Sequence, residues 1–226
     1  MDSLWLYIIL ISLIAIMFLS ERRYPGVVLR IEENILATLL ATITLVSFFQ
    51  VIARYGFNAS WSGGLEFVRI LFAWMILFGM SYGIKTGLHL GVDAVIRLLP
   101  KPAFKIAAVM GGLFTLLYAV ILISADWLAI FGSESDGGAI SYWLRFFNAG
   151  IGLQDLRYPL WLQESFGFPE RVPRWVAYMM LPVGLALLGF RALEATVQIV
   201  MGRRELIIAS HEGEDLLADN RANSKD

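Results

Sequence analysis

Long apolar stretches separated by short charged ones are the main pattern along this chain. A helix needs about 20 mostly apolar residues to cross a bilayer core about 30 Å thick. Five stretches come near that length, at about 4–19, 34–53, 66–84, 105–131 and 175–201. The first would be only about 24 Å long as a helix, so it either spans the membrane or lies tilted in the interface. The pattern predicts an all-α integral membrane protein with a single membrane domain over residues 1–201.

Composition narrows the class of protein further. Of the 226 residues, 58% are hydrophobic and 16% are charged, which is more apolar than a soluble domain. The net charge of -1 gives no basis for nucleic-acid binding, and the lack of cysteine excludes disulfides and thiolate metal ligands. We therefore expect no enzyme activity and no cofactor, and we expect contact with membrane lipid.

The distribution of Lys and Arg predicts the orientation. These residues are concentrated in segments 20–33, 85–104 and 202–226, and short basic loops resist translocation. We expect these segments in the cytoplasm, with residues 202–226 as a mobile tail. Ser20-Glu-Arg-Arg23 stands where a signal peptide would have small residues, so the first stretch is expected to be retained. Five spans place the N-terminus outside and the C-terminus inside, whereas four place both inside.

The outer loop, at about 132–174, is rich in amphipathic aromatic residues, among them Trp143 and Trp161. Such residues are typical of short helices at a membrane–water interface, and equally of a surface that meets another protein. Both interpretations stay open at this point.

The middles of the predicted spans carry few ionisable groups. Buried charge is costly and usually marks a transport or proton pathway, and both histidines, His89 and His211, fall outside the spans. Two histidines inside the membrane, as haem ligands, are therefore excluded. We infer that this chain does not carry a substrate pathway by itself.

Two pairs of opposite charges lie near the ends of spans. Glu66 and Arg69 are three residues apart and share a helix face. They form either a local ion pair or a contact to a partner helix. Arg191 and Glu194 repeat this spacing near the inner side, where Arg191 could also extend its head group towards water.

A glycine seam and a short polar stripe follow each other. Gly79, Gly83 and Gly87 recur every fourth residue, which allows another helix to approach closely. His89, Asp93 and Arg97 then recur at four-residue steps among apolar residues up to Pro100. This pattern predicts an interfacial helix at about 88–99 on the cytoplasmic face.

At these residues the chain resembles the small membrane subunit, of DctQ type, of tripartite ATP-independent periplasmic (TRAP) transporters. The resemblance covers about 31–201. It rests on Arg54-Tyr-Gly-Phe-Asn58, Trp61, Glu66, Arg69, Trp74, Gly87-Leu-His89-Leu-Gly-Val-Asp93 and Leu-Leu-Pro100. The family commonly has paired glutamates before the arginine, whereas Leu65 replaces the first here. The N-terminal stretch adds an expected extra helix to the family's four.

The resemblance implies a subunit of the bacterial inner membrane with a periplasmic outer loop. In such systems a periplasmic solute-binding protein captures the solute, a large permease subunit moves it with a sodium gradient, and the small subunit braces the large one. Residues 152–159 resemble the version found in C4-dicarboxylate systems. The rival interpretations are a membrane anchor of a redox enzyme complex and a self-contained small transporter or channel.

The candidate partner-contact residues combine these observations. They are Glu66, Arg69, Trp74, Gly79, Gly83, Gly87, His89, Asp93, Arg97, Trp143 and Trp161.

Overall fold

A computed structural model of the chain describes residues 4–59, 61–86, 100–134 and 137–202. The predicted interfacial helix at 88–99 lies outside these ranges, as does the predicted tail from residue 203 onwards. The chain divides into two compact units: Met1–Gly79 with Val120–Leu187, and Met80–Ala119 with Leu188–Asp226.

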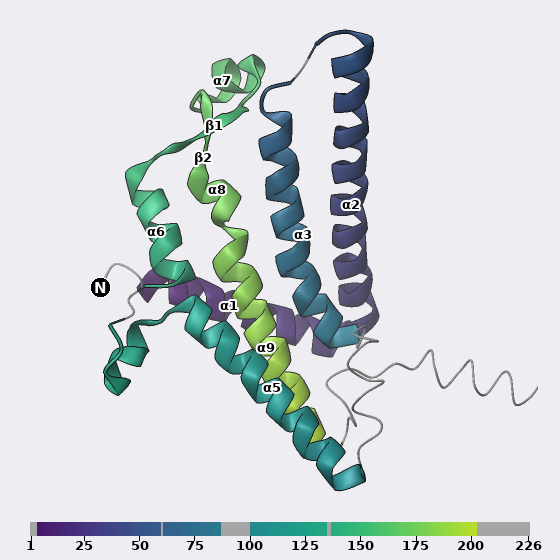
Figure 1. The fold of residues 1–226 in the computed structure, drawn as a ribbon, viewed down its shortest axis with the longest axis vertical. Coiled ribbons are helices and arrows are strands. Elements are labelled where there is room, and N and C mark those ends of the chain that lie inside the picture. Colours follow the sequence, from purple (N-terminus) through teal and green to yellow (C-terminus); the bar gives the residue numbers. More distant parts are fainter. Residues whose placement is uncertain (1–3, 60, 87–99, 135–136, 203–226) are drawn as a thin grey trace, which may run out of the picture. The chain divides into compact units, whose positions relative to one another are not determined.

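Helices make up most of the described chain (Figure 1). The long ones are α1 (Leu4–Arg23), α2 (Pro25–Gly56), α3 (Gly64–Thr86), α5 (Lys101–Ile123) and α9 (Met180–Val200). The short elements are η1 (Asp126–Phe131), α6 (Ala139–Ala149), β1 (Gly152–Arg157), α7 (Leu160–Phe166), β2 (Arg171–Pro173) and α8 (Arg174–Tyr178). Five helical segments are long and apolar enough to cross a membrane, counting α8 and α9 as one. The prediction of a helical integral membrane protein is confirmed.

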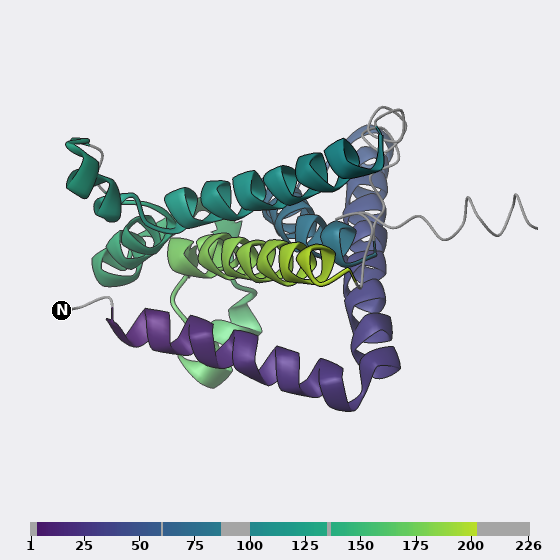
Figure 2. The ribbon, with the colours of Figure 1, turned by 90° about the horizontal axis from the view of Figure 1, so that it is seen from below.

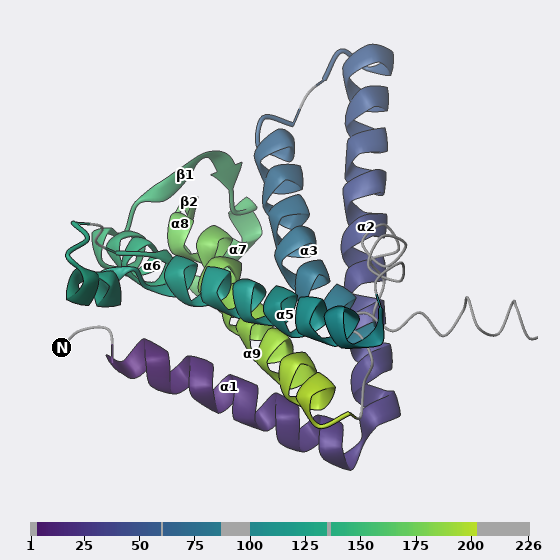
Figure 3. The ribbon, with the colours of Figure 1, turned by 60° about the horizontal axis from the view of Figure 1, so that its bottom comes forward.

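Helix α1 meets α2 at a sharp corner, which Figures 2 and 3 show from two sides. Tyr24 alone separates the two helices, and Pro25 begins α2. Proline suits a first helical position because the amide hydrogen it lacks would have had no partner inside the helix. In the first unit α1 therefore runs across the lower end of α2 and does not lie alongside it.

Two predicted span boundaries differ from the structure. Helix α2 begins at Pro25 and not near 34, because helical geometry continues through the charged residues that hydropathy counts as a loop. Helix α5 ends at Ile123 and not near 131. There the Ala125 amide donates to the Gly137 carbonyl, and the Asp126 Oδ1 accepts from the Gly137 amide at 2.6 Å. These bonds hold the chain in a turn, and the apolar residues that follow form η1.

The core of the first unit joins α1, α6, α8 and α9. Leu6, Leu10, Ile140, Trp143 and Ala186 are buried together. The Trp143 ring stacks on Phe147 with centroids 5.0 Å apart and meets Trp175 edge-on at 6.2 Å. Aromatic pairs in these geometries add stability beyond their buried area. This cluster anchors the N-terminal helix to the region that the sequence predicted as an outer loop.

That region contains a small sheet that the sequence analysis did not predict. Strand β1 pairs antiparallel with the three-residue strand β2, and α7 lies in the connection between them. An ion pair between Arg157 and Glu170 links the two sides of the connection. The short helices that were expected there, α6 and α7, are present.

In the second unit, α5 packs against the C-terminal half of α9. Ala108 and Ile199 are buried together with Phe104 and Val109 around them. A Cβ on Gly189 would lie 3.4 Å from the Cβ of Ala119. Small residues at this crossing bring the two helices into direct backbone proximity.

Candidate partner-contact surface

Glu66 joins the first turn of α3 to strand β1. Its Oε2 accepts hydrogen bonds from the amides of Asp155 and Leu156, both at 2.8 Å, and its Oε1 accepts from the amide of Gln154 at 3.3 Å. A carboxylate in the first turn also suits the positive end of the helix dipole. Glu66 therefore attaches the β1–α7–β2 segment to α3.

An irregularity in β1 explains why Glu66 is needed. The paired residues Gly152 and Arg157 are five positions apart on β1, but their partners Pro173 and Arg171 are two apart on β2. The extra residues of β1 bulge, and a bulge leaves backbone groups outside the ladder. The amide of the buried Leu156 needs an acceptor, and the Glu66 carboxylate supplies one for it and for the two exposed amides before it.

The turn before α3 fits closely against the same strand. Gly63 is buried, and a Cβ there would lie 2.9 Å from the Asp155 carbonyl oxygen and 3.0 Å from the Leu156 Cα. A Cβ on Gly64 would overlap the side-chain amide of Gln50 in α2. The sequence analysis missed these two glycines, although a glycine pair directly before a charged first turn was a visible signal.

Arg69 does not pair with Glu66. The Arg69 side chain is exposed, and among the described residues no carboxylate lies within ion-pair distance of it. The Glu66 oxygens instead face the backbone of β1. Of the two open interpretations, the local ion pair is therefore wrong, and Arg69 remains a candidate for contact with another molecule.

Trp74 and Trp143 both point inward. The Trp74 indole donates to the Ala177 carbonyl oxygen at 2.7 Å, and the Trp143 indole donates to the Trp175 carbonyl oxygen at 2.8 Å. Trp143 is only 5% exposed. Both side chains therefore fix helices of this chain to one another. Trp161, on α7, is 61% exposed.

Gly79, the first glycine of the predicted seam, faces helix α2 of the same chain. A Cβ on Gly79 would lie 3.7 Å from Leu36 of α2, which is an ordinary contact. Gly83 is buried in the second unit. A closer approach occurs elsewhere, because a Cβ on Gly184 of α9 would lie 2.7 Å from the Cβ of Leu77 in α3. The periodic pattern did not include Gly184.

Arg191 lies in the middle of α9 and is only 2% exposed, so it does not reach towards water. Its guanidinium donates to Glu194 Oε2 at 2.9 Å, which confirms the predicted contact at three-residue spacing. The half-buried Glu194 carboxylate thereby balances the charge of the buried guanidinium.

Some predicted residues lie outside the described ranges, namely Gly87, His89, Asp93 and Arg97, as does His211. Among the residues that the structure describes, no group of three or more His, Cys, Asp or Glu is placed to hold a metal ion.

Helix α2 leaves much of its apolar surface uncovered within the described part of the first unit. Of its 32 residues only Glu32 is buried. The large apolar side chains exposed on its second half include Leu45, Phe48, Phe49, Val51 and Ile52. Within the described residues of the first unit nothing covers this face, so we infer that lipid or another protein does.

Comparisons with known proteins identify the family. A family model described as "Tripartite ATP-independent periplasmic transporters, DctQ component" matches residues 43–202. A "C4-dicarboxylate TRAP transporter small permease protein DctQ" of Vibrio cholerae is 32% identical over 82% of this chain and 78% of its own. The protein of the same name from Pseudomonas aeruginosa is 30% identical over 83% of this chain and 91% of its own. The protein of the same name from Rhodobacter capsulatus is 27% identical over 73% of this chain and 74% of its own.

These matches confirm the resemblance that the motifs indicated. The family is a transporter subunit and not an enzyme, and its members form part of an assembly with a large permease and a solute-binding protein. The apolar helices make this chain a multi-pass protein of the inner membrane. The chain belongs to the DctQ family, the small permease subunits of TRAP transporters.

Proposed function

We propose that this small permease subunit braces the large permease subunit during sodium-driven, binding-protein-dependent uptake of a C4-dicarboxylate. The uncovered apolar face of α2 carries the proposal. A helix of 32 residues that buries one residue against its own chain has most of its surface left for a neighbouring helix. Membrane helices associate through close packing of this kind of surface.

The interior of the described chain supports a structural role. Hydrogen bonds between different helices and strands hold parts of this chain together. They involve the carboxylate of Glu66 and the indoles of Trp74 and Trp143. In the middle of α9 the buried guanidinium of Arg191 donates to Glu194 of the same helix, so we assign solute movement to the large subunit. The names of the relatives support a C4-dicarboxylate as the solute.

The orientation belongs to the same proposal. Arg22, Arg23 and Arg30 flank the α1–α2 corner, and we place that corner in the cytoplasm together with the C-terminal end of α9. The β1–α7–β2 segment then lies on the periplasmic side. The exposed Trp161 of α7 and the exposed Arg69 of α3 become available there to the solute-binding protein or to the large subunit.

Cysteine cross-linking tests the contact with the large subunit directly. The natural chain has no cysteine, so single-cysteine variants give no background. We expect Phe49→Cys on α2 to cross-link to the large permease subunit in membranes. Ile11→Cys, on the exposed side of α1, is the matched control and should react with added maleimide but not with the large subunit. Cross-linking from Ile11→Cys alone would contradict the proposal.

Reconstitution into vesicles tests whether this chain carries a solute pathway of its own. We expect sodium-dependent uptake of a labelled C4-dicarboxylate into vesicles only when this chain, the large subunit and the solute-binding protein are all present. Uptake by this chain alone would show that it carries its own pathway, and would refute the bracing role.

A further inference from the structure

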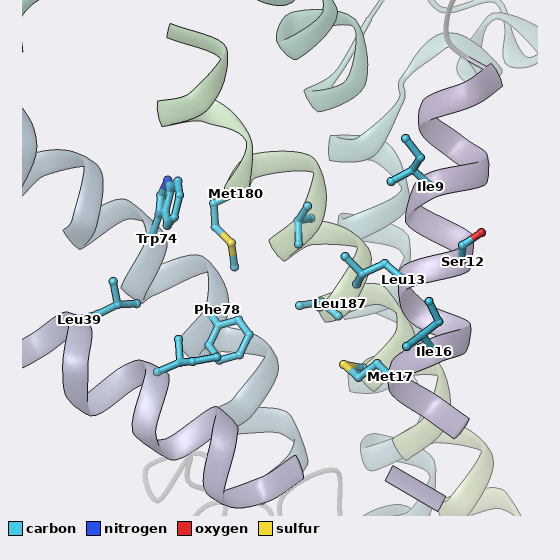
Figure 4. A pocket seen from close by; sticks show the side chains of 12 residues that line it. Ile9, Ser12, Leu13, Ile16, Met17, Leu39, Trp74, Phe78, Met180 and Leu187 are labelled. Atoms are coloured by element: carbon cyan, nitrogen blue, oxygen red, sulfur yellow. The ribbon is translucent and has the colours of Figure 1, made fainter. Parts of the chain in front are cut away.

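An apolar cavity of about 780 Å³ lies in the first unit between α1, α2, α3 and α9 (Figure 4). Helix α1 contributes residues between Ile9 and Met17, and Leu39, Phe78 and Leu187 come from the other three helices. Figure 4 shows Leu13, Phe78 and Leu187 facing a common space. Helix α1 lies outside the residues that match the DctQ family model.

Water does not suit this cavity. Of the twelve lining residues only Ser12 and Trp74 carry a polar side-chain group. The Trp74 indole already donates to the Ala177 carbonyl oxygen at 2.7 Å, which leaves a single hydroxyl. A buried water needs two to four polar partners. The occupant must therefore be apolar along most of its length.

The cavity is open to the hydrocarbon around the chain. Its rim includes Ile9, Ile16 and Ile35, which are 51%, 65% and 41% exposed. At about 30 Å³ for a group the size of a water molecule, a volume of about 780 Å³ holds on the order of 25 methylene-sized groups. One acyl chain of a phospholipid fits that space, with room for part of a second.

The end of the cavity nearest the α1–α2 corner carries positive charge. Met17 and Ile35 line this end, and Arg22 and Arg30 follow or precede them by five residues on their helices. Five residues of helix are about 7.5 Å, a distance that a glycerol phosphate can cover. Arg22 and Arg30 are exposed, and within the described residues neither has a carboxylate partner.

The acidic residues near this corner do not cancel that charge. Glu21 is half-buried, Glu32 is buried, and Glu33 is exposed. Each of the three already interacts with another group of the chain. Arg23 is a third exposed cation beside them, with its guanidinium over the Tyr24 ring. The exposed side chains at the corner therefore carry more positive than negative charge.

We propose that this cavity binds one anionic phospholipid of the bilayer, with an acyl chain between α1 and α3 and the phosphate at Arg22 and Arg30. The lipid fills the space that α1 leaves beside the family helices and so fixes α1 to them. A phosphate held by two arginines gains charge-assisted hydrogen bonds. Phosphatidylcholine offers the same phosphate, but its choline cation would be repelled by the two guanidinium groups, so the anionic phosphatidylglycerol should bind more tightly.

Native mass spectrometry of the full chain, purified in mild detergent, tests the occupant. We expect one phospholipid per chain in the wild type, and at least tenfold less in Leu13→Trp, which obstructs the cavity. Ile11→Trp is the matched control, since it adds the same side chain to the exposed side of α1, and it should keep the lipid. Equal retention in the two variants, or only detergent in the wild type, would overturn the proposal.

A second measurement does not depend on a cavity variant. Phosphatidylglycerol with brominated acyl chains, added in one equivalent to the delipidated wild type in detergent, should quench the fluorescence that Trp74 contributes. That contribution is the difference between the wild type and Trp74→Phe. No quenching of it would exclude an acyl chain in the cavity.

The charge of the head group has its own control. Arg22→Gln with Arg30→Gln should reduce the preference for phosphatidylglycerol over phosphatidylcholine several-fold, whereas Arg54→Gln, at the other end of α2, should not. Equal loss in both would contradict a phosphate site at the corner. Cross-linking of Leu13→Cys to another polypeptide in membranes would show that a protein helix fills the cavity, and would also overturn the proposal.

Discussion

The carboxylate of Glu66 holds the bulged strand β1 against α3, and removing it should loosen that strand in a graded way. Two of its hydrogen bonds are 2.8 Å long and one is 3.3 Å. Bonds to a charged group contribute about 1.5 to 3 kcal/mol each, and the lower figure applies here because most of these groups are exposed. Counting the two 2.8 Å bonds alone, Glu66→Ala should therefore cost about 3 kcal/mol in the attachment of β1.

Glu66→Gln should cost about half as much. Its side-chain carbonyl oxygen can still accept from the amides of Asp155 and Leu156, but neutral bonds are roughly half as strong. The new NH₂ group faces the Gln154 amide, where two donors meet. We expect a loss of about 1.5 kcal/mol on these grounds.

Hydrogen exchange followed by mass spectrometry measures this attachment directly. Since about 1.4 kcal/mol is a factor of ten, the amides of residues 154–156 should exchange about tenfold faster in Glu66→Gln and on the order of 100-fold faster in Glu66→Ala. Arg69→Gln is the matched control on the same helix face and should leave these amides within about twofold of the wild type. Exchange at the wild-type rate in Glu66→Ala would refute the reasoning, as would equal acceleration throughout α9.

Three further predictions concern packing inside the chain. Gly184→Ala should lower stability in detergent by about 1 to 3 kcal/mol, because its Cβ would press on α3. Gly79→Ala is the control and should be near neutral. Thermal unfolding compares the two variants, and a greater loss in Gly79→Ala would contradict the close approach of α9 to α3. Glu194→Gln removes the carboxylate that pairs with the buried Arg191, and it should lower the free energy of unfolding by about 3 kcal/mol. Glu170→Gln, in an exposed ion pair, should lower it by at most about 1 kcal/mol. Trp143→Phe keeps an aromatic ring but loses a half-buried hydrogen bond and part of a buried indole. It should cost at least about 1 kcal/mol, measured as a shift of the denaturation midpoint, and an unchanged midpoint would show that the indole bond contributes nothing.

The apolar stretches could be predicted from the sequence because a bilayer allows few alternatives to a helix of sufficient length. Their ends could not be predicted as well. Hydropathy places the start of α2 near residue 34, but charged residues continue the same helix from Pro25. The end of α5 depends on bonds from Ala125 and Asp126 to Gly137, which join residues more than ten positions apart.

For the candidate partner-contact surface, the sequence predicted which residues are unusual but not which groups they contact. Glu66 was recognised as unusual, but its partners are backbone amides almost ninety residues further along the chain, and no spacing pattern indicates such a contact. Strand β2 has only three residues, too few to show alternation. Gly184 was missed because its close approach to Leu77 depends on how two helices cross, not on a repeat within one helix.

The one-residue link at Tyr24 restricts how the protein can enter the membrane. Antiparallel helices that return alongside each other need a loop of about two to five residues, and here the second helix begins directly after a single residue. The translocon therefore cannot insert the first two helices as a helical hairpin. The orientation of α1 in the membrane therefore depends on that of α2. A mutation that reverses the orientation of α2 should also reverse that of α1, so that the two helices behave as one topogenic unit.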